Sequence, residues 1–138
     1  VLGAGGLRVD LAKAKAERNL EKRARLALDN AAAQLRHASG IYDAGDWDKT
    51  RAALDEMRES VDLAYASLKE TGKAPRNSRH FKNLEIKTRT LLKHFTDFRR
   101  KMAFEDREQV APIEAHIQQV HDEVLESILA PPAREGRR

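Results

Sequence analysis

Five histidines are the residues of this chain best suited to bind a metal ion or to transfer a proton: His37, His80, His94, His116 and His121. A metal site in the core of a helical bundle uses carboxylates from facing helices together with Glu-x-x-His pairs. The chain has no Glu-x-x-His, and the nearest spacing, Gln118-x-x-His121, lacks the charge that a hard metal ion requires. His116 and His121 are five residues apart and therefore diverge on a helix. We expect solvated or partly packed imidazoles, with no metal and no cofactor.

Other catalytic patterns are also missing from the sequence. Histidine phosphotransfer domains carry a Lys three residues after the reactive His and a Gly four residues after it, and neither His37 nor His94 is followed by that pair. Thr71-Gly72-Lys73 lacks the preceding glycine and strand of a phosphate-binding loop. There is no nucleophile elbow, and no pair of carboxylates differs from ordinary surface acids. We therefore expect a protein that is not an enzyme.

The run from Lys93 to Lys101 mixes basic and aromatic side chains, as nucleic-acid-binding segments do. On a helix its two Phe residues fall on the apolar face, so they would not be free to stack on bases. Phosphate could still bind to the basic side chains, in keeping with the isoelectric point near 9.5. The candidate surface for a polyanion, either nucleic acid or an anionic membrane, consists of Lys87, Lys93, Arg99, Arg100 and Lys101.

The segment that contains this run, residues 78–102, is the centre of the predicted fold. Its apolar residues recur at spacings of three and four, which predicts an amphipathic helix and a core face. That face carries three of the four Phe residues and consists of Phe81, Leu84, Thr88, Leu91, Phe95, Phe98 and Met102. Similar stripes predict helices over about 8–44, 46–71 and 112–130, with 131–138 as a polar tail. We expect an all-α single domain over 1–138, built as an antiparallel up-down-up-down four-helix bundle.

The net charge alternates along the chain. It is +4 over residues 1–39, −4 over 40–71, +8 over 72–102 and −4 over 103–138. In a bundle whose helices lie beside their chain neighbours, the basic third helix would sit between two acidic ones. Opposite charges would then favour this pairing, although exposed ion pairs contribute only about 0–1 kcal/mol each.

The turns are marked by helix-stopping and helix-capping residues. Gly45 ends the first helix and Asp46 caps the second; Gly72 and Pro75 end the second, and Asn77 or Ser78 caps the third. The segment from Tyr42 to Lys49 resembles the turn between the helices of a tetratricopeptide repeat, but the sequence departs at Thr50 and has no second copy at a period of 34 residues. We interpret it as a tight helical hairpin.

The first predicted helix is longer than the second. Pairing from the Gly45 turn uses the first helix back to about Asn19, so a further 12 residues, about 18 Å of helix, would project beyond the bundle. This overhang is the first place where we expect a protein partner or self-association. Its candidate surface consists of Arg8, Lys13, Lys15 and Arg18.

Composition limits the remaining function classes. Cysteine is absent, which excludes disulfides and thiolate sites, and no apolar run approaches the roughly 20 residues of a membrane-spanning helix, so we expect a soluble protein. The small residues Gly3–Gly6 would suit the segment after a cleaved leader, which favours export to a periplasm over the cytoplasm. The leading hypothesis is a non-enzymatic interaction or scaffold module; the alternatives are a polyanion binder and a small-ligand or metal sensor.

Overall fold

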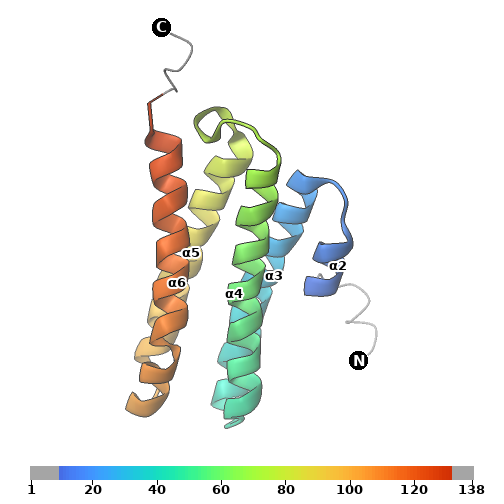
Figure 1. Cartoon of the computed structure of the whole chain (residues 1–138). Coiled ribbons are helices and arrows are strands. Elements are labelled where there is room, and N and C mark those ends of the chain that lie inside the picture. The colour runs from blue at the N-terminus through green and yellow to red at the C-terminus, as the bar shows by residue number, and fades with distance from the viewer. Residues whose placement is uncertain (1–9, 132–138) are drawn as a thin grey trace, which may run out of the picture.

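The computed structural model describes residues 10–131, and the predicted all-helical fold is confirmed over this range (Figure 1). The described part contains five α-helices, one short 3₁₀ helix and no strand. None of these helices is both long and apolar enough to span a membrane. The elements are α2 (Leu11–Ala16), α3 (Leu20–Asp43), α4 (Trp47–Glu70), the 3₁₀ helix η1 (Pro75–Asn77), α5 (Arg79–Arg100) and α6 (Phe104–Leu129).

The predicted stop and cap residues are confirmed at the turns between α3 and α4 and between α4 and α5. Gly45 and Gly72 adopt positive φ angles of 86° and 72°, a conformation that glycine enters without a Cβ penalty. The Asp46 side chain accepts a hydrogen bond from the Lys49 amide and caps α4. The Ser78 side chain accepts from two amides in the first turn of α5. Short side chains with an oxygen thus satisfy amides that have no partner inside the helix.

The long, projecting first helix was a wrong prediction. The chain leaves the helical conformation between α2 and α3, and α2 folds back alongside α3 (Figure 1). Asn19 caps α3 by accepting from the Lys22 amide at 2.8 Å, and the Arg23 side chain donates to the Glu17 carbonyl oxygen at 2.8 Å. The fold-back also buries Ala14 completely. A continuous helix would have left Ala14 in water and Asn19 inside a helix, where it is a poor former.

The last helix begins eight residues earlier than the predicted residue 112. Its first turn is held by Tyr42, whose hydroxyl donates to Asp106 at 2.8 Å and accepts from the Ala103 amide at 2.9 Å. Pro112 therefore lies inside α6 instead of at its start. It is exposed, so water can reach the Glu108 carbonyl oxygen that has no amide donor from residue 112.

The four long helices form two layers. In Figure 1, α4 and α6 lie in front of α3 and α5, and successive helices run in alternating directions. Helix α3 packs against α4 and α5 packs against α6, while α4 also lies beside α6 and α3 beside α5. The basic helix α5 thus packs on α6 and α3 and less closely on α4, whereas the sequence analysis expected it to lie between α4 and α6. The α4–α5 connection passes diagonally from one layer to the other.

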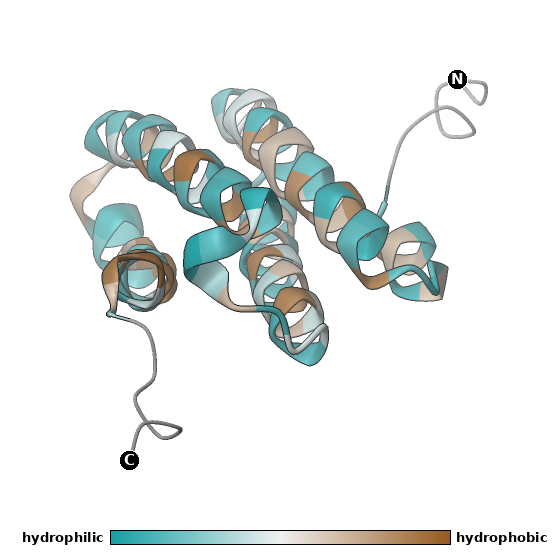
Figure 2. Cartoon of the chain, turned by 90° about the horizontal axis from the view of Figure 1, so that it is seen from above, coloured by the Kyte–Doolittle hydropathy of each residue, from teal (hydrophilic) through white to brown (hydrophobic). Residues whose placement is uncertain are grey.

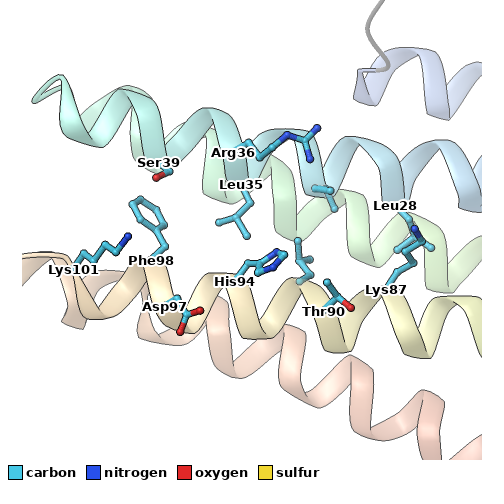
Figure 3. Close-up of a pocket in the computed structure, with 13 residues that line it drawn as sticks. Leu28, Leu35, Arg36, Ser39, Lys87, Thr90, His94, Asp97, Phe98 and Lys101 are labelled. Carbon is cyan, nitrogen blue, oxygen red and sulfur yellow. The ribbon is translucent and has the colours of Figure 1, made fainter.

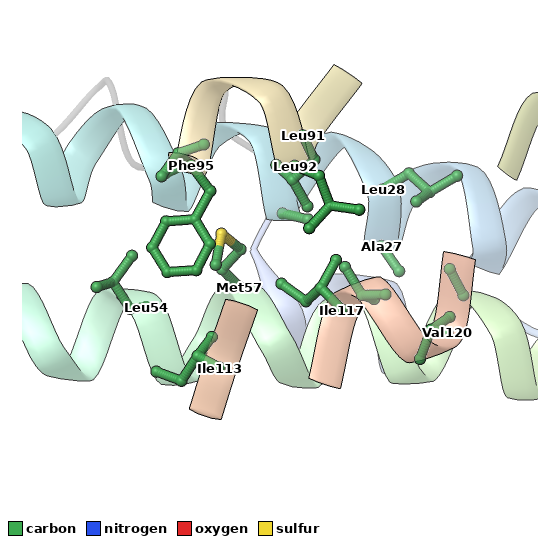
Figure 4. Packing of buried hydrophobic residues seen from close by; sticks show 14 of the residues in the cluster. Ala27, Leu28, Leu54, Met57, Leu91, Leu92, Phe95, Ile113, Ile117 and Val120 are labelled. Atoms are coloured by element: carbon green, nitrogen blue, oxygen red, sulfur yellow. The ribbon is translucent and has the colours of Figure 1, made fainter. Parts of the chain in front are cut away.

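The predicted core face of α5 is confirmed. Its seven stripe residues, from Phe81 to Met102, are all buried. Phe95 is fully buried and lies near Met57 and Leu54 of α4 and Ile113 of α6 (Figure 4). When the chain is viewed from above, the apolar residues of the helices lie toward the space between the helices (Figure 2). Each large side chain buried in this way contributes roughly 1.5–3 kcal/mol, which makes this core the main source of stability.

Candidate functional site

An elongated groove of about 530 Å³ runs between α3 and α5 in the layer at the back of Figure 1. The residues that line it recur at helical spacing, so each helix presents one continuous stripe to the groove (Figure 3). Helix α3 contributes Leu28, Ala31, Ala32, Leu35, Arg36 and Ser39. The other wall consists of Lys87, Thr90, Leu91, His94, Asp97, Phe98 and Lys101.

The floor of the groove is apolar. Leu28, Leu35, Leu91 and Phe98 form most of it, and each keeps between 5% and 7% of its surface exposed. Between Leu28 and Leu35, α3 contributes only the small side chains of Ala31 and Ala32 to the lining. The floor residues thus belong to the core and also reach solvent through the gap between the two helices.

The rim of the groove is basic. Arg36 stands on the α3 edge, and Lys87 and Lys101 stand near opposite ends of the α5 edge (Figure 3). These three side chains are exposed, and within residues 10–131 they form no ion pair and donate no hydrogen bond. The single acidic residue of the lining, Asp97, is paired with Arg100 at 3.4 Å. Positive charge therefore follows the groove along its whole length with little local neutralisation.

The candidate polyanion surface is divided by the structure. Lys87 and Lys101 lie on the groove rim, and Lys93 is exposed outside it. Arg99 is committed to α6, because its side chain lies 2.7 Å from a Glu114 oxygen and also donates to the Arg107 carbonyl. Arg100 stays exposed while pairing with Asp97 of its own helix. The five residues predicted as one surface thus belong to three different environments.

The candidate partner surface at the start of the chain is also changed. Arg8 lies outside the described residues. Lys13 and Arg18 are exposed, and Lys15 makes an ion pair of 3.0 Å with Glu59 of α4. Because α2 lies on α3 and α4, these basic residues belong to an internal contact and its edge, and no projecting helix displays them.

Three of the histidines link neighbouring helices through carboxylates. His116 lies 2.6 Å from Asp62, His121 lies 2.8 Å from Glu85, and His80 lies 3.4 Å from Glu21. Hydrogen bonds from Arg89 and then His121 hold the pKa of Glu85 well below its usual value, at about 2, although burial acts in the opposite direction. No cluster of three or more residues suited to hold a metal ion occurs between residues 10 and 131.

The groove was missed in the sequence analysis, although several residues of its α5 wall had been noticed singly. Leu91 and Phe98 were assigned to a core stripe, and Lys87 and Lys101 to a polyanion surface. Arg36 and His94 were given no shared role. No local signal could have joined them, because the groove depends on α5 lying beside α3.

Comparisons of the chain with protein-family models, curated proteins and solved structures find no match. The groove therefore has to be interpreted from its own chemistry. It offers apolar contact along its floor and unneutralised positive charge along its rim, which are the elements of a binding surface.

Proposed function

We propose that the protein is a non-enzymatic helical binding module and that the groove between α3 and α5 holds its partner. The observation that carries this proposal is the combination of an apolar floor with three cations that have no ion pair in the described range. Solvated lysines and arginines are ordinary on a surface, and so are single apolar side chains. A continuous apolar trench edged by cations on both sides is a less common combination and fits a ligand that is both apolar and anionic.

The same proposal includes a finer description of the fold. We interpret α3–α6 as a four-helix bundle made of two antiparallel hairpins, α3–α4 and α5–α6, that are joined by a diagonal connection, with α2 as an additional helix docked on one side of it. In this interpretation α2 covers the α3–α4 side, and the α3–α5 side is left for a partner. The groove is then a gap in the outer covering of the bundle.

A titration with 8-anilinonaphthalene-1-sulfonate, a small probe that is apolar and anionic, tests the proposal. We expect saturable binding at one site with a Kd on the order of 10–100 µM, which suits a ligand of this size. Ala32→Phe should abolish this site because the ring would fill the groove. The matched control is Ala66→Phe, which introduces the same ring at an exposed position of α4.

Equal binding of the probe by the wild-type protein and the Ala32→Phe variant would disprove the proposed site. Circular dichroism checks that each variant keeps its helices. If Ala32→Phe fails to fold, Ser39→Phe blocks the same groove nearer the Lys101 end and replaces it in the comparison.

A second candidate function is a polyanion binder that uses the exposed cations of α5. It is favoured by the arrangement of the layers, because α3 and α5 together carry eleven basic and five acidic side chains, a net charge of +6. Phosphate chains would contact the lysines and arginines without entering the groove. This difference separates the two candidates experimentally.

A further inference from the structure

The shape of the groove restricts the form of its occupant. Lys101, the residue that caps the C-terminal end of α5, lies 14 residues after Lys87, which corresponds to about 21 Å at 1.5 Å per residue. The groove lies between two neighbouring helices, and its lining follows three turns of α3 and four turns of α5 (Figure 3). A third helix of about four turns can lie along such a trench and place one apolar residue per turn on the floor.

The distribution of charge indicates how the occupant is charged. The three unpaired cations stand at both ends and in the middle of the groove, with Arg36 on one edge and the two lysines on the other. A fatty acid carries a single carboxylate and would match a cluster of cations at one end. A ligand that carries carboxylates along its length matches all three positions. The rim thus favours an acidic peptide over an anionic lipid.

The molecule already contains one helix docked in this manner. Helix α2 lies on α3 and α4, buries the small side chain of Ala14 and pairs Lys15 with Glu59. Helix α2, which carries two lysines, thus packs mainly on α3 and reaches the acidic helix α4 through the Lys15–Glu59 ion pair. The groove on the other side of α3 has the opposite sign, so the corresponding helix there would be acidic.

A second copy of this chain does not fit the groove as well. The acidic layer of α4 and α6 exposes two large hydrophobic residues within the described range, Phe104 and Leu129. They are 25 residues apart on α6, about 37 Å, so they cannot form the continuous stripe that the floor requires. Nucleic acid is disfavoured as well, because the floor offers one aromatic ring, Phe98, of which 6% is exposed.

We propose that the groove between α3 and α5 binds an acidic amphipathic helix of a partner protein. The apolar face of that helix lies on Leu28, Leu35 and Leu91, and its carboxylates face Arg36, Lys87 and Lys101. This inference rests on the proposed function, since it names the class of partner for the same groove.

The test uses a synthetic helical peptide of about 18 residues, with leucines at spacings of three and four and glutamates on both flanks. Its amino terminus carries fluorescein, and binding to the full chain is followed by fluorescence anisotropy at low salt. A peptide with the same composition in scrambled order removes the apolar face, and a peptide with lysine in place of glutamate reverses the charge. We expect binding of the first peptide alone.

Charge reversal in the protein provides the matched comparison. The Lys87→Glu/Lys101→Glu variant should bind the acidic peptide at least about tenfold more weakly, since two attractive contacts become repulsive. It should also bind the lysine peptide better than the wild-type protein does. The control Lys82→Glu/Lys93→Glu changes the net charge of the same helix equally, at exposed positions outside the groove, and should weaken binding less than about threefold.

The outcomes separate this inference from the proposed function. If the fluorescent sulfonate binds the groove but the acidic peptide does not, or if both double variants weaken the peptide equally, the inference is wrong and the groove takes a different ligand. Displacement of the sulfonate by laurate, without peptide binding, would assign the groove to anionic amphiphiles. A dimer that the Ala32→Phe variant loses in sedimentation would assign it to a second copy. If neither the sulfonate nor the peptide binds, the proposed function fails as well.

Discussion

At the scale of single residues, Glu85 is a carboxylate whose contacts lower its pKa and thereby stabilise the fold. It accepts hydrogen bonds from Arg89 at 2.9 and 3.1 Å within α5 and lies 2.8 Å from His121 of α6. These contacts hold its pKa at about 2, below the 4.5 of an unperturbed glutamate. A lowered folded-state pKa stabilises the protein above pH 4.5, and this stabilisation is lost as the pH falls from about 4.5 to 2.

Glu85→Gln should therefore lower the free energy of unfolding at pH 7 and flatten its decline in acid. We expect a loss of about 1–2 kcal/mol at pH 7, because Arg89 is largely exposed and its contribution is screened by solvent. Urea unfolding followed by circular dichroism at pH 7, 4.5 and 3 measures both effects. Asp97→Asn, which removes an exposed carboxylate from the same helix, should cost less than about 0.5 kcal/mol; an equal loss would contradict the assignment.

At the scale of the elements, the docking of α2 depends on one small buried residue. Ala14 is fully buried, whereas Ala12 of the same helix is exposed. Helices of six residues have little stability of their own, so α2 persists because of this contact and its caps. The fold-back is therefore a tertiary feature.

Ala14→Asp should detach α2 and leave the rest of the fold in place, because a carboxylate cannot be buried there without a partner. Limited trypsin digestion should then cleave faster after Arg18, and the mean helical content should fall slightly. Ala12→Asp introduces the same charge on the exposed side and should leave the cleavage rate unchanged. Equal rates for the two variants would mean that the Ala14 contact does not hold α2.

Helix α6 contains a proline, Pro112, that lowers stability only locally. Pro112 is the ninth residue of the helix and cannot donate to the carbonyl oxygen of Glu108. Its position on the solvent side makes this tolerable, and the buried neighbours Val110 and Ile113 hold the helix on the core.

Pro112→Ala should therefore stabilise the protein, since it restores a hydrogen bond and removes a ring from the helix interior. The expected gain is about 1–3 kcal/mol, with a rise in the midpoint of thermal unfolding. Ala115→Gly, at an exposed position of the same helix, should act in the opposite direction by about 1 kcal/mol. An unchanged midpoint in the Pro112→Ala variant would show that the proline imposes no strain on α6.

At the scale of the whole molecule, the two layers carry opposite charge. Helices α4 and α6 have five basic and thirteen acidic side chains, a net charge of −8, against +6 for α3 and α5. Contacts between the layers therefore join unlike charges, as in the pair of Arg99 and Glu114. Within the acidic layer, the contact of His116 with Asp62 at 2.6 Å joins α6 to α4. The basic layer is the one that contains the groove.

This two-sided distribution predicts how duplex DNA should behave. We expect weak, non-specific binding with a Kd above about 10 µM at physiological salt and a steep loss as salt rises. Lys93→Glu/Arg100→Glu should weaken it, while Ala32→Phe should leave it unchanged because phosphates do not enter the groove. Anisotropy of a labelled duplex at several salt concentrations checks this. Tight binding that the Ala32→Phe variant keeps and the Lys93→Glu/Arg100→Glu variant loses would favour the polyanion function over a peptide partner.

The sequence by itself determined that the chain is helical, the turns at Gly45 and Gly72, and the buried face of α5. Spacings of three and four, glycines that stop helices and side chains that cap them act over a few residues, so local physics decides them. That is why the Asp46 cap, the Ser78 cap and the core positions of Phe81 and Phe95 were predictable.

Only the tertiary structure decided which helices are neighbours, and with them the groove. An apolar stripe does not specify which partner it packs against. Charge alternation favoured α4 beside α5, whereas in the fold α5 packs more closely on α3 than on α4. The fold-back of α2 has the same origin, because burying Ala14 and capping α3 with Asn19 outweighs continuing the helix into water. Residues such as Arg36 and Lys87, 51 positions apart in the chain, face one ligand site because two helices were brought side by side.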